Sequence, residues 1–155
     1  MTTQALPSSE APSAAKTETS LTGTPLVTLT WTALRAVSGL LFAVHGMQKV
    51  LGWFATREQP PVFSQLWIGG VIELVTGLLI AAGLFTRPAA FLASGTMAVA
   101  YIQFHWKFAF ADGAWLPVLN HGELSVIYCF LFLFLFAAGG GRWSLDAVRK
   151  ERAQR

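Results

Sequence analysis

The stretch WIGGVIELVTGLLIAAGLF, residues 67–85, decides the fold, because its only polar side chains are Glu73 and Thr76. A helix needs about 20 consecutive apolar residues to cross the hydrocarbon core of a bilayer. Lipid offers the backbone no hydrogen-bond partner, so a spanning segment must be a helix or part of a closed barrel. The alternation of apolar and polar residues that is typical of barrel strands is missing here. The stretch therefore predicts a transmembrane helix.

Three further segments of similar length and character predict three more spanning helices. They are residues 31–54, 88–106 and 120–138, and the last ends at three consecutive glycines. The composition agrees, because 54% of the residues are hydrophobic and only 12% are charged, about half the charge of a typical soluble domain. We therefore expect an all-α protein, an integral membrane four-helix bundle.

The two ends of the chain differ from the apolar centre. Residues 1–30 are rich in Ser, Thr, Ala and Pro, and we expect a disordered tail there. Residues 31–141 form the expected four-helix domain, and residues 142–155 form a basic cytoplasmic tail. Ser144 is a candidate N-cap for a short helix in that tail. Trp143, Leu145 and Val148 would rest on the lipid headgroups while the basic residues meet anionic lipid.

The positions of Lys and Arg predict that both termini lie in the cytoplasm, because cytoplasmic loops carry an excess of these residues. With this orientation only Lys49, Arg57 and Lys107, among the 11 basic residues, lie on the outer side. The other eight lie on the inner side, and they are Lys16, Arg35, Arg87, Arg142, Arg149, Lys150, Arg152 and Arg155. The net charge of +3 arises from basic residues that lie at the ends of the apolar segments, so it does not indicate nucleic-acid binding.

Polar residues inside the predicted spans are the candidates for function, because a charge near the membrane centre is costly and needs a partner. His45 and Lys49 are four residues apart, so they share one helix face. Glu73 shares a face with small residues, which predicts that it points into the bundle and pairs with Lys49 or His45. Arg35 lies nearer the inner side, and we expect its long side chain to extend to the inner surface.

The third and fourth predicted helices carry further polar residues at their outer ends. Tyr101 and His105 lie on one face of the third helix, and His121 opens the fourth. The polar faces of the four helices would then face one another in the outer half of the bundle. The candidate pocket for a ligand or a proton comprises His45, Lys49, Glu73, Tyr101, His105 and His121.

Each of these residues also has a purely structural interpretation. Glu73 and Lys49 form an ion pair that holds two helices together in that interpretation, and His45 is a core histidine with its hydrogen bonds satisfied. His105 and His121 lie near the interface, where water solvates them. Glu123 follows Asn120 by three residues, the spacing of a capping box at a helix start.

No motif for a resident cofactor stands out. The single cysteine, Cys129, excludes an intrachain disulfide and dithiol chemistry by this chain alone. The three histidines lack a spacing that favours a metal or haem, although ligation of haem by His45 and His121 is conceivable. No glycine-rich phosphate loop follows a strand. A quinone remains compatible with a pocket of aromatic side chains and a few polar anchors, for which we name Tyr101, His45 and Glu73.

Four ordered motifs resemble the DoxX family of small membrane proteins. They are HGMQKVLGWF (45–54), GGVIELVTGLLIAAGLFTRPAA (69–90), NHGELSVIY (120–128) and GRWSLDA (141–147). The resemblance covers about residues 34–147. It implies a multi-pass protein of the bacterial inner membrane that is linked to quinol oxidases, thiosulfate:quinone oxidoreductases or redox-stress proteins. It assigns no catalytic residue, so whether the chain is an enzyme stays open.

Two classes of function follow. The first is a non-autonomous component of a membrane redox system, quinone-linked or concerned with oxidative stress, which acts with other membrane proteins and uses the outer polar pocket. The second is a membrane scaffold, chaperone or interaction protein whose polar residues only hold the bundle together.

Overall fold

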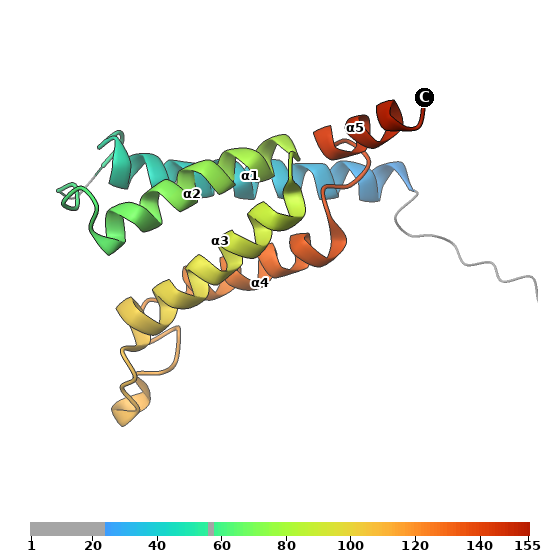
Figure 1. The fold of residues 1–155 in the computed structure, drawn as a ribbon. Helices are drawn as coiled ribbons and strands as arrows, with labels where there is room; N and C mark the ends of the chain where they lie inside the picture. Colours follow the sequence, from blue (N-terminus) through green and yellow to red (C-terminus); the bar gives the residue numbers. More distant parts are fainter. Residues whose placement is uncertain (1–23, 56–57) are drawn as a thin grey trace, which may run out of the picture.

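The computed structural model describes residues 24–55 and 58–155, and this part of the chain is helical without a strand (Figure 1). Its five α-helices confirm the all-α expectation. They are α1 (Pro25–Val50), α2 (Gln65–Ala82), α3 (Thr86–Ala100), α4 (Glu123–Ala138) and α5 (Leu145–Ala153). A π-helical turn, η2 (Tyr101–Trp106), continues α3, and a short 3-10 turn, η3 (Ala111–Gly113), lies in the loop before α4.

Helices α1 and α2 form an antiparallel hairpin whose backbones touch at glycines. A Cβ atom on Gly39 would lie 2.7 Å from the carbonyl oxygen of Gly77, and one on Gly46 would lie 2.6 Å from that of Gly70. Small residues at such crossings allow close van der Waals contact, which drives helix association in lipid. The hairpin therefore brings the side chains that flank these glycines into direct contact.

Helix α2 ends at Gly83, and α3 begins almost at once. Gly83 has φ +71, a left-handed conformation that suits glycine, and the Leu84 N–H donates to the Leu79 carbonyl at 2.9 Å. Helix α3 then packs against α4 and, less extensively, against α2. The turn after Gly83 thus sends the chain back along a second antiparallel hairpin, α3–α4.

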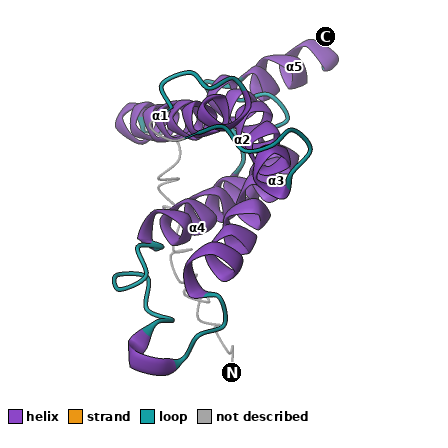
Figure 2. Cartoon of the chain, turned by 90° about the vertical axis from the view of Figure 1, so that its left-hand side faces the viewer, coloured by secondary structure: helices purple, strands orange, loops and turns teal. Residues whose placement is uncertain are grey.

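The two hairpins meet through an aromatic core. Phe42 of α1 packs on Phe132 and Tyr128 of α4, with ring centroids 4.7 and 5.5 Å apart, and all three are buried. In Figure 1 the hairpins lie close at the end that carries the α2–α3 turn and α5, and they diverge toward the opposite end. Figure 2 shows the η3 loop extending beyond the helices at that open end.

The outer faces of the helices carry many exposed large apolar side chains. On α4 only Phe132 and Leu135 of the Phe-Leu run are fully buried, whereas Phe130 is 65% exposed. Helices α1 and α2 are long and apolar enough to cross a membrane, and α4 is a shorter apolar helix. An apolar exterior of this kind suits contact with lipid and not with water.

Several expected boundaries need correction. Helix α1 begins at Pro25, capped by Thr24, so the expected tail is already helical from residue 25; residues 1–23 lie outside the described part. Helix α4 begins at Glu123 and not at Asn120, and Glu123 is exposed without the side-chain bond of a capping box. The capping-box interpretation was therefore wrong. The short tail helix is confirmed, because the Ala147 N–H donates to Ser144 Oγ at 3.2 Å.

Candidate functional site

Lys49 and Glu73 form an ion pair between α1 and α2, the only one in residues 24–55 and 58–155. Lys49 Nζ lies 2.5 Å from Oε1 and 2.7 Å from Oε2 of Glu73. The Glu73 side chain is only 4% exposed, and that of Lys49 is 33% exposed. The contact depends on Gly70, because a Cβ there would lie 2.6 Å from Lys49 Cβ. The expected pairing of Glu73 with Lys49 is thus confirmed.

This ion pair lines a groove between α2 and α3. The groove has a volume of about 360 Å³, within the usual range of small-molecule sites. Apart from Lys49 and Glu73, the lining residues are uncharged and mostly apolar. They are Gln65, Leu66, Ile68, Gly69, Ile72, Phe91, Leu92, Gly95, Thr96, Val99, Ala100 and Phe104. The groove can therefore hold an apolar body against one charged pair.

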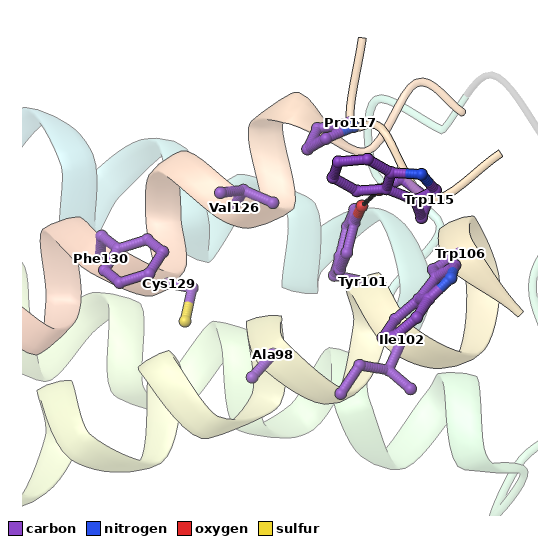
Figure 3. A pocket seen from close by; sticks show the side chains of 9 residues that line it. All are labelled: Ala98, Tyr101, Ile102, Trp106, Trp115, Pro117, Val126, Cys129 and Phe130. Carbon is purple, nitrogen blue, oxygen red and sulfur yellow. Dashed lines mark hydrogen bonds between the residues drawn. The ribbon is translucent and has the colours of Figure 1, made fainter. Parts of the chain in front are cut away.

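A second cavity, of about 370 Å³, lies between the end of α3 with η2 and the first half of α4 (Figure 3). Tyr101 and Trp115 lie at one end of it, and Cys129 and Phe130 at the other. The Tyr101 hydroxyl donates to the Trp115 carbonyl. The walls are otherwise apolar, so this cavity offers few groups that would orient a polar ligand. Its remaining lining residues are Ala98, Ile102, Trp106, Pro117 and Val126.

Asn120 organises the polar groups beside this aromatic cavity. Its Nδ2 donates to the Ala114 carbonyl at 2.9 Å and to the Tyr101 hydroxyl at 3.3 Å, while its Oδ1 accepts from the Gly122 N–H at 2.9 Å. His105 Nδ1 lies 3.1 Å from the Asn120 carbonyl. These hydrogen bonds therefore hold the loop before α4 against Tyr101 and His105 of η2. The sequence predicted only a capping role for Asn120, because its contacts with Tyr101 and Ala114 depend on how the loop folds.

The six candidate pocket residues do not share one cavity. Lys49 and Glu73 line the groove, whereas Tyr101 lines the aromatic cavity together with α4. His45 is half-buried and makes no hydrogen bond or ion pair to any described residue. His121 is exposed in a turn at φ +58. Because the hairpins diverge toward this end, the polar faces separate into an α1–α2 pair and an α3–α4 group.

Arg35 forms a second polar centre, at the end where the hairpins meet. Its guanidinium donates to the carbonyls of Ile80 and Ala81 at 2.6 and 2.7 Å, and to that of Trp143 at 2.9 Å. The residue is only 2% exposed, so the expectation that it reaches the inner surface was wrong. The carbonyls at the end of α2 carry partial negative charge and need donors, and Arg35 supplies them.

Asp146 acts in the same region, at the start of α3. Its Oδ1 accepts from the Phe85 N–H at 2.9 Å, and its Oδ2 accepts from the Thr86 N–H at 2.8 Å. Burial by itself raises the pKa of Asp146, but the hydrogen bonds from Thr86 and Phe85 and the charge of Arg149 outweigh it, and the pKa is lowered overall. Asp146 was not singled out from the sequence, because it is 60 residues from the helix that it caps.

Comparison with known proteins adds family information. A model of the DoxX family matches residues 30–106, from α1 to the end of η2. An uncharacterized protein of Haemophilus influenzae is 39% identical over 116 residues, which cover 73% of this chain and 85% of that protein. An uncharacterized membrane protein of Mycobacterium tuberculosis is 30% identical over 135 residues, which cover 77% of this chain and 81% of that protein. No solved structure matches the chain significantly.

Proposed function

Because the chain belongs to the DoxX family of membrane proteins, we propose that it is a non-autonomous component of a membrane redox system. In this proposal it acts with other membrane proteins and binds a small amphipathic molecule, such as a quinone, in the groove between α2 and α3. The observation that carries the proposal is the Lys49–Glu73 pair in the lining of an otherwise uncharged groove. Ionisable groups within a membrane domain indicate a ligand or proton site by default.

The proposed topology has four spans, α1, α2, α3 with η2, and α4, in the bacterial inner membrane. Both termini lie in the cytoplasm, since this orientation leaves only Lys49, Arg57 and Lys107 on the outer side. In Figure 1 the α2–α3 turn and α5 lie at one end of the molecule, opposite the loops that would face outward. The groove with Lys49 and Glu73 then opens in the outer half of the membrane.

The chemistry of the pair suits a carbonyl ligand. A lysine ammonium has three N–H donors, and the two oxygens of Glu73 accept from Lys49 at 2.5 and 2.7 Å. The partly exposed Lys49 can direct its third donor to a quinone oxygen. Phe91 and Phe104 offer apolar contact to the ring, and an isoprenoid tail would leave the groove toward lipid.

The test is to purify the protein in mild detergent, extract it with organic solvent and identify any co-purified quinone. We expect quinone in the wild type, and a loss of about ten-fold or more in Lys49→Met, because one hydrogen bond to a charged group contributes about 1.5–3 kcal/mol. Lys107→Met is the matched control, since Lys107 is exposed and lies outside the groove. Equal quinone contents in both variants would refute the groove as the site.

A genetic test separates this function from that of a scaffold. His45→Ala and Glu73→Gln are expressed in a deletion strain at the wild-type protein level. The redox proposal predicts a loss of quinone-dependent turnover or of resistance to oxidants in Glu73→Gln. Full complementation by both variants would replace the redox proposal with the scaffold interpretation.

A further inference from the structure

A third cavity, separate from the groove, lies where the start of α3, the end of α4 and α5 meet. Its volume is about 450 Å³. Three basic residues line it, Arg87 at the start of α3 and Arg149 and Lys150 on α5. The glycines at 139–141 form part of its wall and contribute no side chains. The redox proposal makes no use of this cavity.

The three bases have no acidic partner within ion-pair distance among residues 24–55 and 58–155. Asp146 also lines the cavity, but both of its oxygens already accept backbone N–H groups of Phe85 and Thr86. Arg149 is held in place, because its guanidinium lies 4.6 Å from the centre of the Phe85 ring. Three basic side chains against the single carboxylate of Asp146 leave the cavity with an excess of positive charge.

One further detail favours an oxygen-rich anion. A Cβ atom on Gly139 would lie 3.4 Å from Arg87 Nε, so the glycine lets the guanidinium lie close to the backbone. Guanidinium and ammonium groups that converge on one space match the geometry and charge of a phosphate.

The surroundings indicate where the phosphate comes from. Trp143, Leu145 and Val148 are 57%, 46% and 43% exposed on the segment that carries Arg149 and Lys150. A short helix with apolar and basic side chains lies in the headgroup region of a bilayer. We propose that this cavity binds the phosphate of an anionic phospholipid, whose acyl chains extend along the apolar exterior of α3 and α4.

The test uses the full chain, delipidated in a neutral detergent. It is titrated with phosphatidylglycerol, with phosphatidylcholine of the same acyl chains, and with soluble glycerol phosphate, and binding is followed by native mass spectrometry. We expect phosphatidylglycerol to bind more tightly than either of the other two. Each charge removed by Arg87→Gln or Lys150→Gln should weaken its binding about five-fold. Arg152→Gln is the matched control, because Arg152 lies on α5 but does not line the cavity.

Three results would overturn the proposal. Equal affinity for phosphatidylglycerol and phosphatidylcholine would show that the cavity does not select negative charge. Equal weakening by Arg152→Gln and Lys150→Gln would show a diffuse surface effect. Glycerol phosphate that binds as tightly as the lipid would identify a soluble ligand. Quinone content is measured on the same variants, so the failure of either proposal is distinguishable from the failure of the other.

Discussion

At the scale of single residues, two long-range contacts hold charges inside an apolar protein. Lys49 and Glu73 neutralise each other between α1 and α2, whereas Arg35 is buried against three backbone carbonyls. The first contact could be predicted, because both residues lie at matching depth on adjacent helices. The second could not, because it requires the ends of α2 and of the segment before α5 to meet. Sequence periodicity describes one helix at a time and does not show such a meeting.

Replacement of Glu73 tests the ion pair. Glu73→Leu should lower the free energy of unfolding by about 1–3 kcal/mol, because it leaves the Lys49 ammonium without its partner in a mostly buried place. Glu73→Gln should cost less, since the amide oxygen still accepts a hydrogen bond. Thermal unfolding in detergent measures both. The double variant Lys49→Met with Glu73→Leu should recover part of the loss; a double variant less stable than Glu73→Leu alone would argue against the pairing.

The Asp146 carboxylate should make the stability of the folded protein depend on pH. Its pKa is lowered in the folded protein, so its contribution to stability is complete above its unfolded pKa of about 3.9 and is lost as the pH falls through the lower folded value. Asp146→Ala should lower stability at pH 7 by about 1 kcal/mol, the usual cost of a lost cap. Comparison of melting temperatures at pH 7 and pH 3 checks this.

The control for Asp146→Ala is Asp112→Asn, because Asp112 lies in the η3 loop, beyond the opposite end of α3 from Thr86, and asparagine tolerates its φ of +51. That variant should behave as the wild type at both pH values. If Asp146→Ala loses as much stability as the wild type on acidification, the carboxylate is not the group that titrates.

At the scale of helices, the lengths of the apolar runs and the positions of the glycines predicted most of the helices and the face that α2 buries. Glu73 and the small residues on its face are buried as expected, and the Ser144 cap begins α5. The starts of α1 and α4 were misplaced by several residues. The start of α1 is set by Thr24 and Pro25, which lie outside the strongest apolar run, and Asn120 is drawn into the loop by Tyr101 and Ala114.

The glycine contacts between α1 and α2 give a matched pair of variants. Gly46→Ala should destabilise the protein by about 1–3 kcal/mol, because its Cβ would lie 2.3 Å from the backbone nitrogen of Leu74. Gly95→Ala should not destabilise the protein and should stabilise it by up to about 1 kcal/mol, because no atom of a packed neighbour lies within 4 Å of its Cβ. Denaturation in mixed detergent micelles measures both. Equal effects would mean that the hairpin is not packed through its glycines.

At the scale of the whole molecule, two hairpins meet at one end and diverge at the other (Figure 1). The sequence predicted the four apolar helices but not this divergence, which depends on the angle of the α2–α3 turn and on how α4 packs against α1. For that reason the residues that we expected in a single pocket line two separate cavities, with Lys49 and Glu73 in one and Tyr101 in the other. The role of His45 and His121 as pocket residues stays a prediction.

Topology is tested with reporter fusions that are active on only one side of the membrane. A reporter fused at Gly113 should be active outside, and one fused after Arg155 should be active inside, because the basic residues favour cytoplasmic termini. Paired reporters with opposite preferences, inserted at the same positions, serve as controls. An outward C-terminal reporter would contradict the proposed orientation.

Because the chain is synthesised from its N-terminus, the three carbonyl partners of Arg35 become available at different times. Its first two carbonyl partners, in Ile80 and Ala81, belong to the same hairpin, but the third, in Trp143, belongs to the last part of the chain. At about 5–20 residues per second, the 62 residues from 81 to 143 take roughly 3–12 seconds to be translated. During that time Arg35 has only the two carbonyls of the first hairpin available, and its third hydrogen bond forms only after Trp143 has been made.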